Sequence, residues 1–161
     1  MKIELYKNNI KYIGDNFKTH FSYDFKVPKK LKLEHKILDK NMLDKEILEQ
    51  WKPQESTLGE LVWALENYEA ILKNGNANIF YIRDKDLRLW AVSAGWGSVH
   101  GGWSVYAISV GYPGPWDAGD RVVSRKFSSS VLGPLDSGDL ESRIKELEDK
   151  VAKLLKVINL T

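Results

Sequence analysis

The side chains that can act as acids, bases or metal ligands are few and widely spaced in this chain. It has three histidines, His20, His35 and His100, and no cysteine. No two histidines stand four residues apart and HExxH is absent, so the spacing of a zinc site on a helix is missing. Neither the dinucleotide fingerprint nor the P-loop occurs, and without cysteine there is no disulfide or thiol nucleophile. The sequence therefore predicts no metal ion and no cofactor.

One pair of carboxylates stands apart from the others. Asp117 and Asp120 are the only Asp or Glu residues in segment 91–125. Their spacing suits a paired general acid and base or two calcium ligands. It suits equally a turn cap and an ion pair with the neighbouring Arg121. A hydrolase that uses Asp117, Asp120 and His100 is therefore one alternative, and it predicts that the three side chains meet in one cleft.

Four tryptophans lie in or beside the same segment. Trp90 and Trp103 stand inside strand-like runs, which favours burial in the core. Trp96 and Trp116 stand beside glycine or proline, where an exposed indole gives a ligand a large flat contact at low entropy cost. Position alone fits Trp96 and Trp116 equally well as scaffold residues and as binding residues.

Segment 91–125 also differs in composition from the rest of the chain. It has no Lys, Glu, Gln, Asn, Thr, Met or Leu, yet it holds seven of the twelve glycines and three of the six tryptophans. Strand-like runs cover 103–110 and 121–125, and the Tyr-Pro-Gly-Pro sequence at 112–115 is a turn signal. This pattern predicts short strands that carry glycine- and aromatic-rich loops.

The elements that must position this segment follow from hydrophobic periodicity. Alternation predicts a hairpin within residues 1–12, with its turn at 7–9, and a strand over 21–27. Apolar residues at loosely helical spacing predict one broken helix over 29–53. These elements precede the more strongly patterned middle of the chain.

Two elements in the middle of the chain have clear signals. A helix is predicted over 57–73, with Thr57 and Glu60 forming a capping box at its start. A hairpin is predicted over 78–93, and its near-continuous apolar strands belong in the middle of a sheet.

The C-terminal part of the chain combines a linker with a heptad repeat. Residues 128–138 are rich in Ser, Gly and Pro, and a helix is predicted over 139–159. Its apolar residues recur at alternating spacings of four and three; they are Leu140, Ile144, Leu147, Val151, Leu154 and Ile158. β-Branched residues at a and leucine at d favour a parallel two-stranded coiled coil, with Arg143 at g facing Glu148 at e of the partner. We therefore predict a homo-oligomer, dimer or trimer; a helix folded back on its own domain is the alternative.

Length and charge limit the remaining function classes. The 161 residues suit one compact domain with an appendage. A net charge of +2 with mixed signs gives no footprint for nucleic acid or for a membrane surface. No apolar run approaches the ~18 residues of a membrane span, and the polar start is unlike a signal peptide. We expect a protein that is cytoplasmic as made or carried on a virion.

The segment NIFYIRDKDLRLWAVSAGWGSVHGGWSVYAISVGYPGPWDAGDRVVSR, residues 78–125, resembles the variable region of target proteins of diversity-generating retroelements. Those proteins have the formylglycine-generating-enzyme version of the C-type lectin fold. Their domains often end in Gly, an aromatic residue, Arg and two hydrophobic residues, and Gly119 to Val123 match this ending except at Asp120. The resemblance covers residues 57–125 and implies a C-type-lectin-like domain.

The resemblance implies which residues vary and which are fixed. In this family the retroelement randomises adenines of AAC-type codons, which never yield Trp, Lys, Glu, Gln or Met. The implied scaffold consists of Trp90, Trp96, Trp103, Trp116 and Arg121. The implied ligand-binding, variable residues are Ser93, Gly95, Ser98, His100, Val105, Tyr106, Ser109, Tyr112, Gly114, Asp117 and Asp120.

The departures from the family also carry predictions. The enzyme that gives this fold version its name needs active-site cysteines, and this chain has none. Calcium-dependent sugar-binding lectins carry EPN or QPD and WND motifs, which Pro115-Trp116-Asp117 matches only faintly. The resemblance therefore implies neither enzymatic activity nor a calcium-bound sugar.

Together these patterns predict an α+β protein. Residues 1–127 are expected to form a C-type-lectin-like mixed α/β domain with short antiparallel strands, followed by the linker and a C-terminal coiled-coil helix. The predicted function is non-catalytic binding of a protein or cell-surface ligand through a sequence-variable surface in loops of residues 93–121. The alternative is a phage or virus-like structural protein that assembles through its coiled coil.

Overall fold

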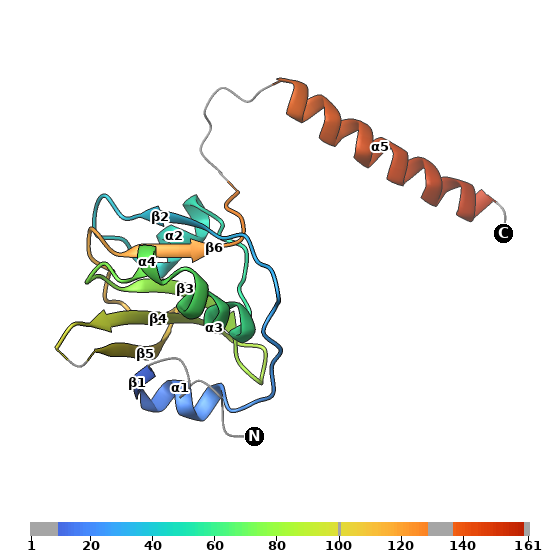
Figure 1. Ribbon diagram of the computed structural model, residues 1–161. Coiled ribbons are helices and arrows are strands. Elements are labelled where there is room, and N and C mark those ends of the chain that lie inside the picture. Colours follow the sequence, from blue (N-terminus) through green and yellow to red (C-terminus); the bar gives the residue numbers. More distant parts are fainter. Residues whose placement is uncertain (1–9, 100, 129–136, 160–161) are drawn as a thin grey trace. The chain divides into compact units, whose positions relative to one another are not determined.

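The computed structural model describes residues 10–99, 101–128 and 137–159, and the chain divides into two compact units, residues 1–130 and 131–161 (Figure 1). The strands and helices α1 to α4 lie in the first unit, and α5 lies in the second. Within the described part of the chain, no helix is long and apolar enough to cross a membrane.

A six-stranded mixed sheet forms the centre of the first unit, in the order β1-β5-β4-β3-β6-β2. Its strands are β1 (Ile10–Ile13), β2 (Glu34–Ile37), β3 (Asn78–Arg83), β4 (Leu89–Gly97), β5 (Gly102–Ser109) and β6 (Arg121–Ser124). β1 pairs with β5 and β3 pairs with β6 in parallel, while the other neighbours are antiparallel. Mixed α and β structure is confirmed, but antiparallel pairing accounts for only part of the sheet.

Four helices accompany the sheet: α1 (Asp15–His20), α2 (Asp44–Gln50), α3 (Leu58–Asn67) and α4 (Glu69–Leu72). The helix predicted over 57–73 is found as two helices, α3 and α4, which are separated at Tyr68. The hydroxyl of Thr57 accepts the backbone N–H of Glu60 at 3.1 Å, and the Glu60 carboxylate accepts the Thr57 N–H at 3.0 Å. The predicted capping box therefore satisfies two donors at the start of α3.

The hairpin predicted over 78–93 is also confirmed, because β3 and β4 pair in unbroken register from Asn78 with Ala94 to Arg83 with Leu89. Both strands are internal in the sheet, and the first five residues of β3 are buried. Burial on both faces explains why the sequence of β3 is continuously apolar rather than alternating.

Two hydrophobic clusters lie on opposite faces of the sheet. Along β3, Phe80 belongs to the first cluster, whereas Ile79 and Tyr81 belong to the second, as the two-residue period of a strand requires. The first cluster contains Phe17 of α1 and the apolar side of α3, and the second contains Ile47 of α2. We name these sides the first face and the second face; α3 lies in front of the sheet in Figure 1.

The strand predicted over residues 21–27 is wrong. The side chains do alternate, since Phe21 is buried and Tyr23 and Phe25 are half-buried against the first cluster. In the described part of the chain, however, the segment joins no ladder. Its backbone packs on α3 instead, where a Cβ on Gly59 would overlap the Lys26 carbonyl oxygen. The alternation therefore reflects an extended segment lying on a helix.

The single broken helix predicted over 29–53 is also wrong. β2 occupies its first half and pairs antiparallel with β6, and α2 follows after a loop. Leu38, Met42 and Ile47 do gather in the second cluster, although the first two reach it from the loop. The apolar spacing indicated shared burial correctly, but a pairing with distant β6 decided the backbone. The short helix α1 was not predicted.

The helix predicted over 139–159 is confirmed as α5 (Ser137–Asn159). The turn expected at residues 7–9 lies outside the described residues, and so does most of the linker expected over 128–138.

Candidate functional site

The pairing of β4 with β5 sorts the predicted site residues between the two faces. Trp103 and Val105 belong to the first cluster. Because side chains alternate along a strand, Ser104 and Tyr106 lie on the second face. On the neighbouring strand β4, Gly95 pairs with Ser104, and Ser93 pairs with Tyr106. Small and aromatic residues of neighbouring strands therefore share one face.

The second face is open where β1, β5 and the adjoining part of β4 form it. Among the described residues, the second cluster contains none from β1 or β5. A Cβ built on Gly95 meets no atom of the described residues within 4 Å, so this part of the chain leaves the space above Gly95 open. We name this region the β1–β5–β4 surface; its residues are Tyr12, Ser93, Gly95, Ser104, Tyr106 and Ile108.

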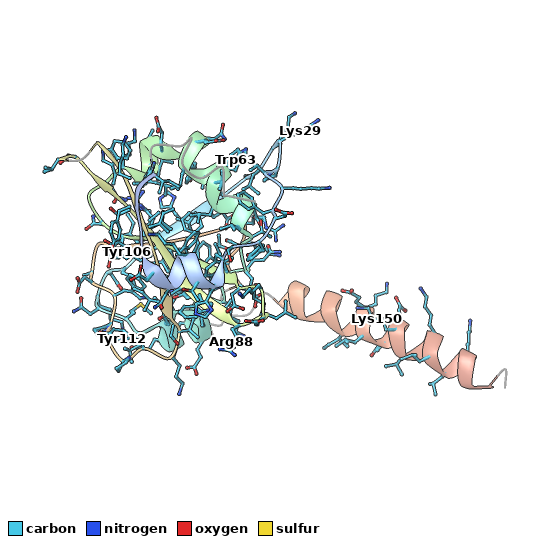
Figure 2. All side chains as sticks on the ribbon, turned by 90° about the horizontal axis from the view of Figure 1, so that it is seen from below. Lys29, Trp63, Arg88, Tyr106, Tyr112 and Lys150 are labelled. Carbon is cyan, nitrogen blue, oxygen red and sulfur yellow. The ribbon has the colours of Figure 1, made fainter. Side chains whose placement is uncertain are left out.

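Two tyrosine rings stand on this surface and contact each other. Tyr12 is 53% exposed and Tyr106 is 44% exposed, and their ring centres lie 5.4 Å apart. Tyr106 also lies against Gly14, since a Cβ there would come within 3.0 Å of the ring. The Gly14 N–H is fixed by a 2.9 Å bond to the Val105 carbonyl. Contacts on both sides therefore hold the ring of Tyr106, which Figure 2 labels.

The floor beside these rings is made of small residues. Ser93 is only 6% exposed, whereas Gly95 and Ser104 are half-buried. The six residues of the surface include no carboxylate, amine, guanidinium or imidazole. Aromatic faces, hydroxyl groups and bare backbone suit contact and hydrogen bonding rather than proton transfer.

The remaining residues predicted from the same strands do not join this surface. Val105 is 1% exposed and points into the first face, and His100 lies outside the described residues. Ser98 is exposed beyond one end of β5, while Ser109 and Tyr112 are exposed at its other end. Because a strand rises about 3.3 Å per residue, the two groups are roughly 25 Å or more apart.

The two candidate acids in the loop after β5 have different surroundings. Asp120 is 8% exposed, and its two oxygens accept the backbone N–H groups of Ala77 and Asp117, each at 3.0 Å. Asp117 itself is exposed. Asp120 therefore closes the turn and ties it to the start of β3. The ring of Tyr112 covers Gly114 in the same loop.

Arg121 donates hydrogen bonds to backbone carbonyl groups rather than to a carboxylate. Its Nη1 donates to the Ile71 carbonyl at 2.8 Å, and its backbone N–H donates to the Ala77 carbonyl at 2.9 Å. Its Nε is buried and has no hydrogen-bond partner among the described residues. Burial lowers the pKa of the His35 imidazole, and the positive charge of Arg121 lowers that pKa further.

The four tryptophans all pack against the two clusters. Trp103 is 1% exposed and meets Trp96 edge to face, with ring centres 5.2 Å apart. The Trp90 indole N–H donates to Asp84 at 2.8 Å, and the Trp116 indole N–H donates to Asp44 at 2.7 Å. The Asp44 and Asp84 side chains thus each satisfy one partly buried indole.

These two carboxylates have pKa values shifted in opposite directions. Burial raises the pKa of Asp44, and the bonds from Trp116 and Tyr81 only partly offset it. For Asp84, burial also raises the pKa, but bonds from the Trp90 indole and from two backbone N–H groups, with the charge of His20, outweigh it and lower the pKa. The phenol of Tyr81, buried beside Asp44, has its pKa raised.

The prediction missed three residues of the surface: Tyr12, Ser104 and Ile108. Ser104 and Ile108 share the strand period of Tyr106, so alternation along 103–110 was a sufficient signal for them. Tyr12 comes from β1, whose parallel pairing with β5 joins segments far apart in the sequence and leaves no local pattern.

No metal site and no relative identifies this surface. Among the described residues, no three His, Asp or Glu side chains are grouped as metal ligands. Comparisons with protein-family models, curated proteins and solved structures found no match for the chain. Function therefore rests on the geometry of the sheet and on the chemistry of its residues.

Proposed function

We propose that this chain is a non-catalytic recognition protein that binds a protein or cell-surface ligand through the β1–β5–β4 surface. One observation carries the proposal: the same strands place indoles on the first face and small or aromatic side chains on the second. Trp103 is 1% exposed, while Tyr106 on the same strand is 44% exposed. The buried face supplies stability, and the open face is free to change.

The residue types of the surface suit a protein ligand. Tyrosine gives a large amphipathic contact for the loss of few rotatable bonds, and serine and glycine give adaptable hydrogen bonding; antibody loops use the same combination. The contacts of Tyr106 with Tyr12 and Gly14 order the ring before binding. Such ordering lowers the entropy cost of forming a complex.

We further propose that the domain is a C-type-lectin-like variable domain of a diversity-generating retroelement. Two observations support this proposal. Segment 91–125 has no Lys, Glu, Gln or Met, which variation of AAC-type codons never yields, and Ser93, Gly95 and Tyr106 share one face, opposite the indoles of β4 and β5. A nearby reverse transcriptase gene and a near-copy of the DNA for residues 91–125, differing only at adenines, are the expected genomic signs.

A structural or assembly role in a phage or virus-like particle is the second candidate, favoured by the apolar seam of α5. The two functions predict different variation between near-identical gene copies. Divergence confined to residues 93–121 supports recognition, whereas divergence spread evenly along the chain supports assembly and contradicts recognition.

A display experiment tests the surface directly. Gly95, Ser104 and Tyr106 are randomised together in a displayed library of the full chain, and a matched library randomises Val92, Ala94 and Val105 on the first face. We expect the first library to stay folded, by protease resistance, and to yield binders to chosen protein targets. We expect the second to lose its fold.

The result that overturns the proposal is an equal loss of folding in both libraries, or a folded first library that yields no binder. Once a natural ligand is in hand, Gly95→Arg should weaken its binding at least tenfold, because the new side chain occupies the open space. Thr19→Arg, which adds the same charge on exposed α1, should leave that binding unchanged.

A further inference from the structure

Helix α5 has a stripe of apolar side chains that no described residue of its own unit covers. Its side chains are described over residues 144–156. Within that range the large apolar residues are 47–63% exposed; they are Ile144, Leu147, Val151, Leu154 and Leu155. Five large apolar side chains on a helix of 23 residues are an unusual amount of surface to leave uncovered. The heptad register of the stripe points to what covers it.

The seam follows a period of 3.5 residues rather than 3.6. Position a holds Ile144, Val151 and Ile158, and position d holds leucine throughout. A strict seven-residue repeat keeps its stripe facing a partner helix only when the two helices supercoil around each other. β-Branched residues at a with leucine at d fit the two-stranded parallel form better than the three-stranded form.

The charges beside the seam select the direction of the partner. In the first two heptads, position e holds Glu141 and Glu148, and position g holds Arg143 and Lys150. In a parallel pair of identical helices, g of one heptad faces e of the next heptad on the other helix, so Arg143 meets Glu148, while Lys150 faces the apolar Leu155. An antiparallel pair sets e against e and g against g, which brings like charges together. Only the parallel arrangement of two copies is therefore complementary.

Further along the helix the flanking positions become apolar. Leu155 occupies e and is 54% exposed, and Val157 occupies g. The seam therefore widens toward the C-terminal end of the helix, where it adds contact area to a coil of only about three heptads. Lys150, which Figure 2 labels, forms its ion pair with Glu146 of its own helix at 3.3 Å.

We infer that α5 binds a second copy of this chain as a parallel two-stranded coiled coil. The partner is identified by the repeat and by the charge pattern, both of which match the helix to itself. Because the helix is short, the association is reversible and depends on concentration. The two chains enter the coil at the same end, so a pair of recognition surfaces can engage one ligand array, a consequence that rests on the proposed function.

The mass of the full chain in solution tests the pairing. Sedimentation equilibrium over a range of concentrations should show a reversible monomer–dimer equilibrium. Leu147→Asn, at d, should weaken dimerisation at least tenfold, whereas Lys153→Asn, at the outer position c, should not change it. Circular dichroism and urea unfolding of the sheet-containing unit verify that both variants keep their fold.

Cross-linking tests the direction, and the absence of native cysteine makes it specific. Under oxidation, Ile144→Cys should give a disulfide-linked dimer, because position a lies beside its own copy in a parallel pair. Lys145→Cys, at b, should not. In an antiparallel pair the two thiols at 144 lie several turns apart and do not link.

Three outcomes overturn the inference. A monomer at every concentration means that another protein or the chain's own domain covers the seam. A trimer contradicts the stoichiometry, and a dimer without cross-linking at 144 contradicts the direction. None of these results affects the display experiment, so a failure of pairing is distinguishable from a failure of the recognition surface.

Discussion

The two faces of one sheet differ in how completely other parts of the chain cover them. On the first face, α1 and α3 bury aromatic and aliphatic side chains almost completely, as Trp103 at 1% exposure shows. On the second face, over β1, β5 and part of β4, no described residue covers Gly95, and Tyr106 is 44% exposed. The strands are the same, so covering helices rather than strand sequence alone decide which residues are buried.

Substitutions on neighbouring residues of one strand should therefore have unequal effects on stability. A close-packed interior responds to the loss or gain of single methylene groups, because its neighbours fill the available space. An open sheet face has no such neighbours. Substitutions that differ only in the face they occupy test this contrast.

The largest effect is expected from truncating an indole. Trp103→Ala should reduce the free energy of unfolding by about 3–5 kcal/mol, because it leaves a cavity in the first cluster and removes the contact with Trp96. Tyr106→Ala, three residues along the same strand, should cost about 1 kcal/mol, from the lost contact with Tyr12. Urea unfolding measures both; comparable losses would contradict the division of faces.

A second pair of substitutions adds one methyl group at a close-packed glycine and one at an open glycine. Gly59→Ala should destabilise the protein by about 1–3 kcal/mol or more, because the new Cβ overlaps the Lys26 carbonyl oxygen and forces α3 from the segment packed on it. Gly95→Ala should be neutral or stabilise by about 0.5 kcal/mol, because its Cβ meets open space and alanine loses less backbone entropy than glycine. Thermal unfolding should show shifts of opposite sign, and a loss at Gly95 would mean that the second face is covered.

The local part of this arrangement could be predicted from the sequence. The capping box of Thr57 and Glu60 and the apolar hairpin over 78–93 depend on residues close together in the chain, so their patterns are complete in the sequence. The odd spacing of Trp103 and Tyr106 within one strand-like run is also a local signal, because it places them on opposite faces. Such signals need no knowledge of distant partners.

What could not be predicted depends on pairing between distant segments. Tyr12 reaches the surface only because β1 lies parallel to β5, and β2 is a strand only because β6 pairs with it. Val105 and Asp120 were assigned to a variable surface by resemblance, yet the first is packed under α1 and α3 and the second holds a turn. Burial is a property of the assembled sheet, and a family pattern does not supply it.

The smallest expected effect concerns the two aspartates that hold indoles on opposite faces. Asp84 has a lowered pKa in the folded protein, so its stabilising contribution is present above the unfolded value of about 3.9 and is lost as pH falls through the folded value. Asp84→Asn should cost about 1 kcal/mol at pH 7, because a charged acceptor of the Trp90 N–H and of two backbone N–H groups is lost. The variant should also lose less stability than the wild type between pH 5 and pH 3.

Asp44 reverses the sign, because burial raises its pKa in the folded protein. Its protonated form is favoured by folding, so its contribution is complete below the unfolded pKa and is lost as pH rises through the folded one. Asp44→Asn keeps an oxygen that can accept both the Tyr81 hydroxyl and the Trp116 N–H, which bond the same carboxylate oxygen at 2.8 and 2.7 Å. It should leave stability at pH 7 within about 0.5 kcal/mol of the wild type or raise it slightly.

Urea unfolding of both variants at pH 4, 5.5 and 7 separates the cases. Parallel pH curves for Asp44→Asn and Asp84→Asn would show that the two indole anchors are electrostatically alike, and that the faces differ in packing alone.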